Sequence, residues 1–183
     1  QNTQSMAKGQ ALRNLQTRLA QRLQEAQTQG SNTSWLAVEV GQARYLLPLE
    51  LAGEIFPPLT TQKVPYTAPW FMGVANLRGH LCGVVDLHAF MGGASLAAKL
   101  LGEDARQDAR YVALHAGLGL NCAFLISKLI GLRSTKDYIS VRPADEGAPD
   151  YLAAVYTDKR GQTWQELNLQ ALARQEALLA IAA

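Results

Sequence analysis

The chain has 183 residues, of which 48% are hydrophobic and 17% charged, and its formal net charge is +2. This composition is typical of a folded protein, and the length allows one domain or two small barrels that share a core. The charge is too small and too scattered for a surface that binds nucleic acid. No run of about 18 apolar residues occurs, so we expect no segment that inserts into a membrane.

The two cysteines, Cys82 and Cys122, each lie within an apolar stretch. This position predicts buried thiols in a reducing compartment. The N-terminal segment is rich in glutamine and has no apolar stretch of the kind found in secretory signals, so we expect a cytoplasmic protein.

The first part of the chain, residues 1–33, is predicted to be a helix and a linker. Its apolar residues recur at intervals of three and four and predict an amphipathic helix over 10–28: Leu12, Leu15, Leu19, Leu23 and Ala26. Such a face can lie on a membrane, on a partner helix or on its own domain. Because the segment has few lysines and no tryptophan or phenylalanine anchor, we expect it to pack against protein.

From Trp35 the pattern becomes that of β-strands, with apolar residues alternating along the chain and turn residues between them. The two halves repeat each other weakly, since Asp86-Leu87-His88-Ala89-Phe90 ends the first and Asn168-Leu169-Gln170-Ala171-Leu172 ends the second. This layout predicts two small barrels of about five strands each, over residues 35–90 and 110–168, because closed barrels leave no exposed sheet edge. A helix over 169–182 follows, with Asn168 as its N-cap. The alternation predicts a first-barrel core of Trp35, Val38, Leu81, Val85 and Leu87.

Four residues that could carry chemistry, His80, Cys82, Asp86 and His88, share one face of a predicted strand. On an extended strand His80 and His88 would lie about 26 Å apart, so they cannot bind one metal ion. Only His80 and Cys82 could share a site, which leaves a thiol- or metal-dependent enzyme as an alternative. The sequence contains no P-loop and neither a G-x-G-x-x-G nor a G-x-S-x-G motif. We therefore expect a protein that is not an enzyme and has no cofactor.

The sequence KVPYTAPWFMGVANLRGHLCGVVDL over residues 63–87 contains several motifs in a specific order. They are Val64-Pro65, Pro69, Phe71, Gly73-Val74, Asn76-Leu77-Arg78-Gly79 and Val85-Asp86-Leu87. This order resembles the signature of the CheW family of bacterial chemotaxis adaptors, which also keeps a Glu-Ile step upstream, here Glu54-Ile55.

The resemblance implies a CheW-like domain over residues 34–174, made of two SH3-like five-stranded β-barrels, with a C-terminal helix over 168–183. It implies a non-catalytic adaptor that couples the signalling tip of a methyl-accepting chemoreceptor to the regulatory domain of a CheA-type histidine kinase. Such an adaptor would be recruited to membrane receptor arrays. The resemblance places the protein-binding surface at six residues: Arg78, Asn76, Leu77, Gly79, Glu54 and Gly73. Arg78 is the expected coupling residue, because a guanidinium at the tip of a turn can make bidentate contacts.

Several departures from the family pattern indicate a divergent branch. Gly83 stands where the family usually has a proline, and Leu125-Ile126-Ser127-Lys128 lacks the acidic residue that often ends the corresponding strand. The tail, with Tyr151-Leu152, Val155-Tyr156-Thr157-Asp158 and the stretch from Trp164 to Leu169, is similar to the PilI branch of type IV pilus twitching systems. A self-assembling structural component of a pilus is a further alternative.

Overall fold

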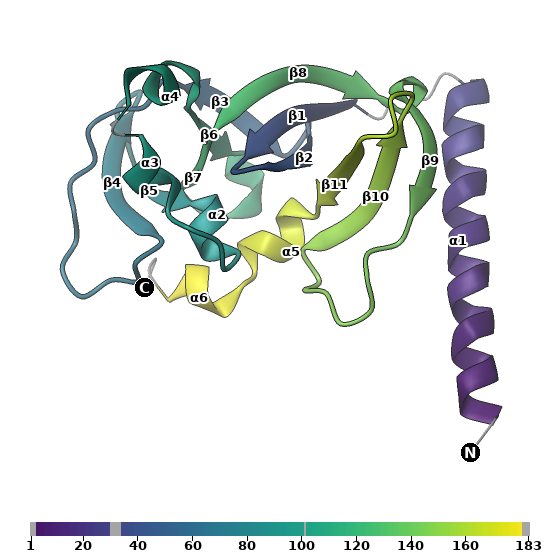
Figure 1. The fold of residues 1–183 in the computed structure, drawn as a ribbon. Helices are drawn as coiled ribbons and strands as arrows, with labels where there is room; N and C mark the ends of the chain where they lie inside the picture. Colours follow the sequence, from purple (N-terminus) through teal and green to yellow (C-terminus); the bar gives the residue numbers. More distant parts are fainter. Residues whose placement is uncertain (1–2, 30–33, 101, 181–183) are drawn as a thin grey trace.

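A computed structural model describes residues 3–29, 34–100 and 102–180, and within the first helix the side chains of residues 9–22. The described chain forms two β-sheets, of six and five strands, with short helices around them and one long helix near the N-terminus (Figure 1). The prediction of a mainly β protein is confirmed.

The six-stranded sheet contains the first two strands of the chain and the last four. These strands are β1 (Ser34–Val40), β2 (Ala43–Pro48), β8 (Lys128–Ser134), β9 (Tyr138–Arg142), β10 (Leu152–Asp158) and β11 (Thr163–Leu167). Their order is β8-β1-β2-β11-β10-β9. Neighbours run antiparallel except β2 and β11, which are parallel.

The five-stranded sheet contains the middle strands of the chain. They are β3 (Ala52–Phe56), β4 (Phe71–Leu77), β5 (His80–Asp86), β6 (Arg110–Leu114) and β7 (Cys122–Ile126). Their order is β3-β6-β7-β5-β4, and only β5 and β7 are parallel neighbours. Among the described strands neither sheet closes on itself, and one of them has six strands. The prediction of two closed five-stranded barrels is therefore corrected to two open sheets of six and five strands.

The two halves of the chain exchange strands. The hairpin β1–β2 belongs to the first half but pairs with β8 and β11 of the second, and the hairpin β6–β7 pairs with β3 and β5 of the first. The structure therefore differs from the predicted division into one barrel over 35–90 and another over 110–168. Turn residues identify each hairpin because they act locally, whereas the neighbour of a hairpin depends on long-range burial of its faces.

The similar sequences that begin at Asp86 and Asn168 each lie where a strand ends and a short helix begins. Asp86 caps α2 (Leu87–Phe90) by accepting a hydrogen bond from the Ala89 amide at 3.2 Å. Asn168 caps α5 (Leu169–Ala173) by accepting one from the Ala171 amide at 3.0 Å. The leucine after each cap is fully buried. The predicted N-cap at Asn168 is confirmed, and the two similar sequences have the same capping role.

The remaining helices are α1 (Thr3–Gln29), α3 (Leu96–Lys99), α4 (Glu103–Asp108) and α6 (Glu176–Leu179), with short 3-10 turns η1 (Ala116–Leu118) and η2 (Thr135–Asp137). The helix α1 contains the predicted segment 10–28 and stands beside β9 at one end of the molecule (Figure 1). The predicted linker at 30–33 lies outside the described residues.

The predicted C-terminal helix over 169–182 is broken. It divides into α5 and α6 at Gln175, whose backbone is extended with φ −62° and ψ 127°. With this break Leu178 is buried in the same main core as Leu169 and Leu172, beside the five-stranded sheet. Residues 181–183 lie outside the described part of the chain.

The core prediction holds for four residues and fails for one. Trp35, Val38, Val85 and Leu87 are buried, but the side chain of Leu81 is 65% exposed. Trp35 also belongs to a separate aromatic cluster, since its ring packs against Tyr138 and Tyr156, whereas the other three lie in the main core.

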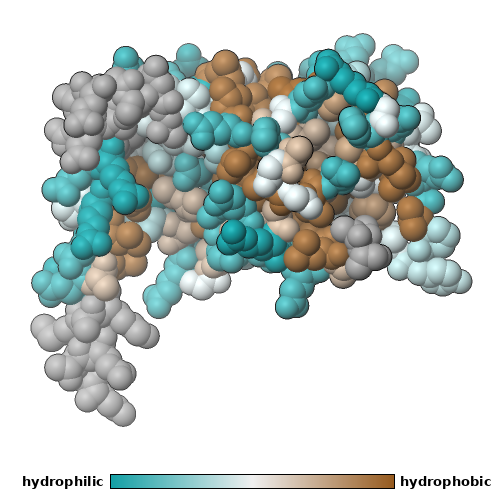
Figure 2. All heavy atoms as spheres, turned by 180° about the vertical axis from the view of Figure 1, so that it is seen from behind, coloured by the Kyte–Doolittle hydropathy of each residue, from teal (hydrophilic) through white to brown (hydrophobic). Residues whose placement is uncertain are grey.

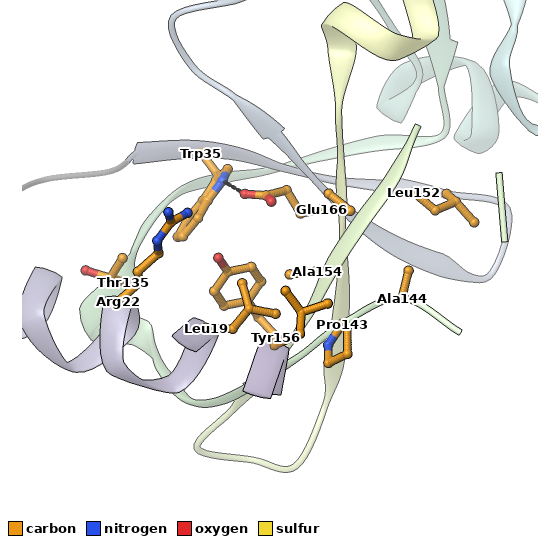
Figure 3. Close-up of a pocket in the computed structure, with 12 residues that line it drawn as sticks. Leu19, Arg22, Trp35, Thr135, Pro143, Ala144, Leu152, Ala154, Tyr156 and Glu166 are labelled. Carbon is orange, nitrogen blue, oxygen red and sulfur yellow. Dashed lines mark hydrogen bonds between the residues drawn. The ribbon is translucent and has the colours of Figure 1, made fainter. Parts of the chain in front are cut away.

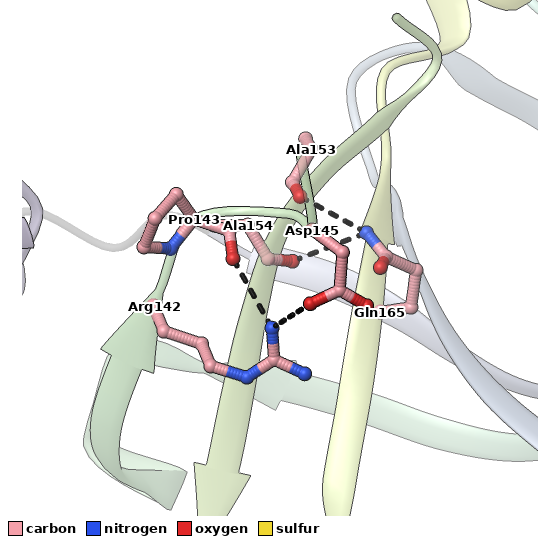
Figure 4. A network of polar contacts seen from close by, with 6 residues as sticks. All are labelled: Arg142, Pro143, Asp145, Ala153, Ala154 and Gln165. Atoms are coloured by element: carbon pink, nitrogen blue, oxygen red, sulfur yellow. Dashed lines mark hydrogen bonds and ion pairs between the residues drawn. The ribbon is translucent and has the colours of Figure 1, made fainter. Parts of the chain in front are cut away.

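A bulge in β10 is stabilised by a side chain of the neighbouring strand. The register of β10 against β11 shifts between Leu152 and Val155, which leaves the carbonyl groups of Ala153 and Ala154 without regular ladder partners. The side-chain amide of Gln165 donates to both carbonyls, at 3.1 and 3.4 Å (Figure 4). The preceding loop is held by Arg142, which bonds Asp145 at 3.0 Å. The Gln165 amide thus supplies hydrogen bonds to backbone carbonyls at the bulge.

Candidate functional site

The turn that carries Arg78 is a two-residue hairpin turn. Leu77 of β4 pairs with His80 of β5, so only Arg78 and Gly79 lie between the strands. Both have positive φ, +52° and +81°, as the tightest hairpin turns require. The side-chain oxygen of Asn76 accepts a hydrogen bond from the Gly79 amide at 2.8 Å. The Asn-x-x-Gly sequence thus fixes the turn, and the turn directs Arg78 outward.

Arg78 forms a bidentate ion pair with Glu54 of β3. Its Nε and Nη1 atoms lie 3.0 Å from the two carboxylate oxygens. Because β3 and the hairpin β4–β5 lie at opposite ends of the sheet order, this pair joins the two ends of a curved sheet. The side chains are 74% and 52% exposed, and the other N–H groups of the guanidinium are free to meet a partner.

The other predicted site residues support this pair from beneath. Leu77 is buried, so its side chain belongs to the core beneath the turn, and its predicted role at the binding surface stays a prediction. Gly73 has a φ of +125°, and a Cβ there would collide with the carbonyl oxygen of Gln62. The same carbonyl accepts a hydrogen bond from the Val74 amide at 2.9 Å. Gly73 therefore allows the loop to close against β4 and acts as a positioning residue.

An apolar groove begins three residues after Arg78, on the outer face of β4, β5 and β7. Its volume is about 440 Å³, and its lining includes Phe71, Val74, Leu81, Val85, Leu120 and Leu178. Sequence reasoning missed this groove because it placed Leu81 in the core. With the two-residue turn of the structure, Leu81 lies opposite the exposed Asn76 and so on the outer face.

The two residues of the alternative enzyme site, His80 and Cys82, differ in exposure. His80 is exposed at the start of β5, whereas Cys82 is buried, and burial raises the pKa of its thiol. Burial raises the pKa of Cys122 to about 12. The second carboxylate oxygen of Asp86 accepts from the Ala97 amide at 3.0 Å, which ties α3 to β5. Protonated thiols are poor nucleophiles and ligands.

No cluster of three or more histidine, cysteine or acidic side chains suited to a metal ion occurs in residues 3–29, 34–100 and 102–180.

The exposed Arg78–Glu54 pair thus lies close along the chain to the groove that begins at Leu81. A family model of the CheW-like domain matches residues 34–177, and the chain belongs to this family. Members of the family are non-catalytic scaffold proteins of chemotaxis signalling. No curated protein matches the sequence significantly.

The fold is similar to the crystal structure of the scaffolding protein TtCheW from Thermoanaerobacter tengcongensis. The two chains are 16% identical with a TM-score of 0.63, and the match covers 80% of this chain and 95% of that chain. None of the helices in the described part of the chain is long and apolar enough to cross a membrane.

Proposed function

We propose that this chain couples a chemoreceptor-like sensor to a CheA-type histidine kinase by binding both without catalysis. The observation that carries the proposal is the exposed Arg78–Glu54 pair beside the groove that begins at Leu81. An adaptor must hold two partners at a fixed angle, and a hairpin bonded to the opposite end of its own sheet is a rigid support for one of them.

The groove suits a helical partner. A receptor signalling tip is a helical hairpin, and an amphipathic helix binds by laying its apolar face into such a groove. Leu81 would meet that face, and Arg78 would bond a carboxylate or carbonyl at its edge. The kinase regulatory domain would contact an exposed end of one of the sheets. The protein would act in the cytoplasm at membrane receptor arrays.

We further propose that the sensory system is one that controls type IV pilus twitching. The support is the resemblance of the tail, from Tyr151 to Leu169, to the PilI branch of the family. In the structure this stretch forms β10, β11 and the start of α5.

The coupling proposal is tested by reconstitution with the receptor signalling fragment and the kinase of the same genome. We expect the chain to sediment with both, and kinase activity to respond to the receptor only when the chain is present. Failure to bind either partner would refute the adaptor role. The pilus proposal has a separate test, since deletion of the gene should abolish twitching, and normal twitching with intact coupling would refute that subtype alone.

A further inference from the structure

The helix α1 lies outside the part of the chain that the family accounts for. The family match begins at residue 34, whereas α1 ends at Gln29. In the structure α1 stands beside β9, and its N-terminal part extends past the two sheets (Figure 1). Contacts within the domain therefore do not explain its full length.

The apolar stripe of α1 is only partly covered by the domain. Leu12 and Leu15 are 48% and 45% exposed, and Leu19 is half-buried. Between the helix and the six-stranded sheet lies a hollow of about 550 Å³, with Leu15 and Leu19 on one side and Trp35 and Tyr156 on the other (Figure 3). Because the domain leaves this space unfilled, the stripe can accept further apolar side chains.

The charges of α1 are mainly positive. Residues 3–29 contain Lys8, Arg13, Arg18 and Arg22 but a single acidic residue, Glu25, so the helix carries a net charge of 4 − 1 = +3. Arg18 and Arg22 are four residues apart and therefore flank the same side of the stripe. Figure 2 shows the described middle of α1 as mainly hydrophilic.

We infer that α1 is a docking helix for a partner protein, and that the segment it binds is an amphipathic helix with acidic residues flanking its own apolar stripe. The leucines spaced by three and four supply the apolar seam, and the arginines select an acidic partner. Pairing with α1 of a second copy would bring two helices of charge +3 together. A membrane surface is disfavoured because α1 contains no aromatic anchor. This inference is independent of the coupling surface at Arg78.

The test uses the full chain and three synthetic helical peptides of about 20 residues with leucines at the same spacing. Their flanking positions carry glutamate, glutamine or lysine, and binding is measured by fluorescence anisotropy. We expect the glutamate peptide to bind at least about ten-fold more tightly than the glutamine peptide, and the lysine peptide least tightly. Added salt should reduce the difference.

Variants separate the two contributions. The double change Arg13→Gln and Arg18→Gln removes two of the four cations and should reduce the preference for the glutamate peptide. The double change Leu12→Ser and Leu15→Ser should weaken the binding of the glutamate peptide and of the glutamine peptide alike. Arg106→Gln, on the exposed surface of α4, is the matched control and should change nothing. Circular dichroism of each variant confirms that the domain stays folded.

Three results would overturn the inference. The first is equal binding of the glutamate and glutamine peptides. The second is a dimer in sedimentation equilibrium that Leu12→Ser converts to a monomer, which would make a second copy the occupant. The third is binding to vesicles of phosphatidylcholine and phosphatidylglycerol that is tighter than binding to the glutamate peptide, which would assign α1 to the membrane.

Discussion

Replacing Arg78 by alanine separates the stability of the hairpin from its role in coupling. The ion pair with Glu54 is bidentate but largely exposed, and exposed pairs contribute about 0.2–1 kcal/mol to the free energy of unfolding. Alanine keeps the Cβ at the same positive φ, so backbone strain in the turn is unchanged. We therefore expect Arg78→Ala to lower the free energy of unfolding by less than about 1 kcal/mol.

Binding should respond far more strongly. Loss of an arginine anchor at an interface costs about 2 kcal/mol or more, which is roughly thirty-fold in affinity. Titration calorimetry with the receptor fragment and the kinase, beside urea melts of the same samples, measures both quantities. Arg160→Ala, at the tip of the β10–β11 turn, is the matched control, and Arg78→Lys tests whether the bidentate geometry matters beyond the charge. If Arg78→Ala still coupled the receptor to the kinase fully, this turn would not be the coupling surface. The surface beside Glu54 would then be the better candidate.

Four further substitutions test the fold and the groove. In urea melts Leu87→Ala should lower the free energy of unfolding by about 2–5 kcal/mol, because its side chain is fully buried. Leu81→Ala should change the free energy of unfolding by less than about 0.5 kcal/mol, because Leu81 is exposed, but it should weaken partner binding. Gly73→Ala should cost about 1–3 kcal/mol in the same melts, since its Cβ would collide with Gln62. Burial raises the pKa of Glu166, so the folded protein holds this proton more tightly than the unfolded chain and loses stability as the pH rises through the folded pKa. Glu166→Gln should therefore be more stable than the wild type near pH 7, with the difference shrinking towards about pH 4; a constant difference would contradict this.

The features that the sequence predicts correctly are local ones. The presence of a turn at Arg78, the N-cap at Asn168 and the periodicity of α1 each depend on residues a few positions apart, although the turn has two residues, Arg78 and Gly79, and not the four from Asn76 to Gly79. Such signals act through backbone conformation and short-range hydrogen bonds, and they do not need the rest of the molecule. The break in the C-terminal helix was not predictable in this way, because Gln175 is a good helix former and the break depends on where Leu178 can be buried.

Of the candidate site, the sequence indicated the residues Arg78 and Glu54 but not the groove beside them. The resemblance gave Arg78 and Glu54, which the structure brings together as an ion pair. The alternation along β5 puts Leu81 and Val85 on one face of the strand but does not say which face is buried. The pairing of Leu81 with the exposed Asn76 places Leu81 on the outer face, and this pairing is known only from the structure.

Because the two halves of the chain exchange strands, neither half should fold alone, whereas two sequential barrels could. A fragment of residues 34–101 would contain the hairpin β1–β2 without β8 and β11, and β3 and β5 without the hairpin β6–β7. Neither sheet would then have its central pairs, and a two- or three-stranded piece is marginal by itself in water. We expect this fragment and the fragment 102–183 each to be unfolded alone, and to regain β structure and a cooperative urea transition when mixed. Far-UV circular dichroism measures this directly. Two fragments that melt cooperatively on their own would show that the parallel contacts β2–β11 and β5–β7 are not required, and that each half folds around its own hairpins.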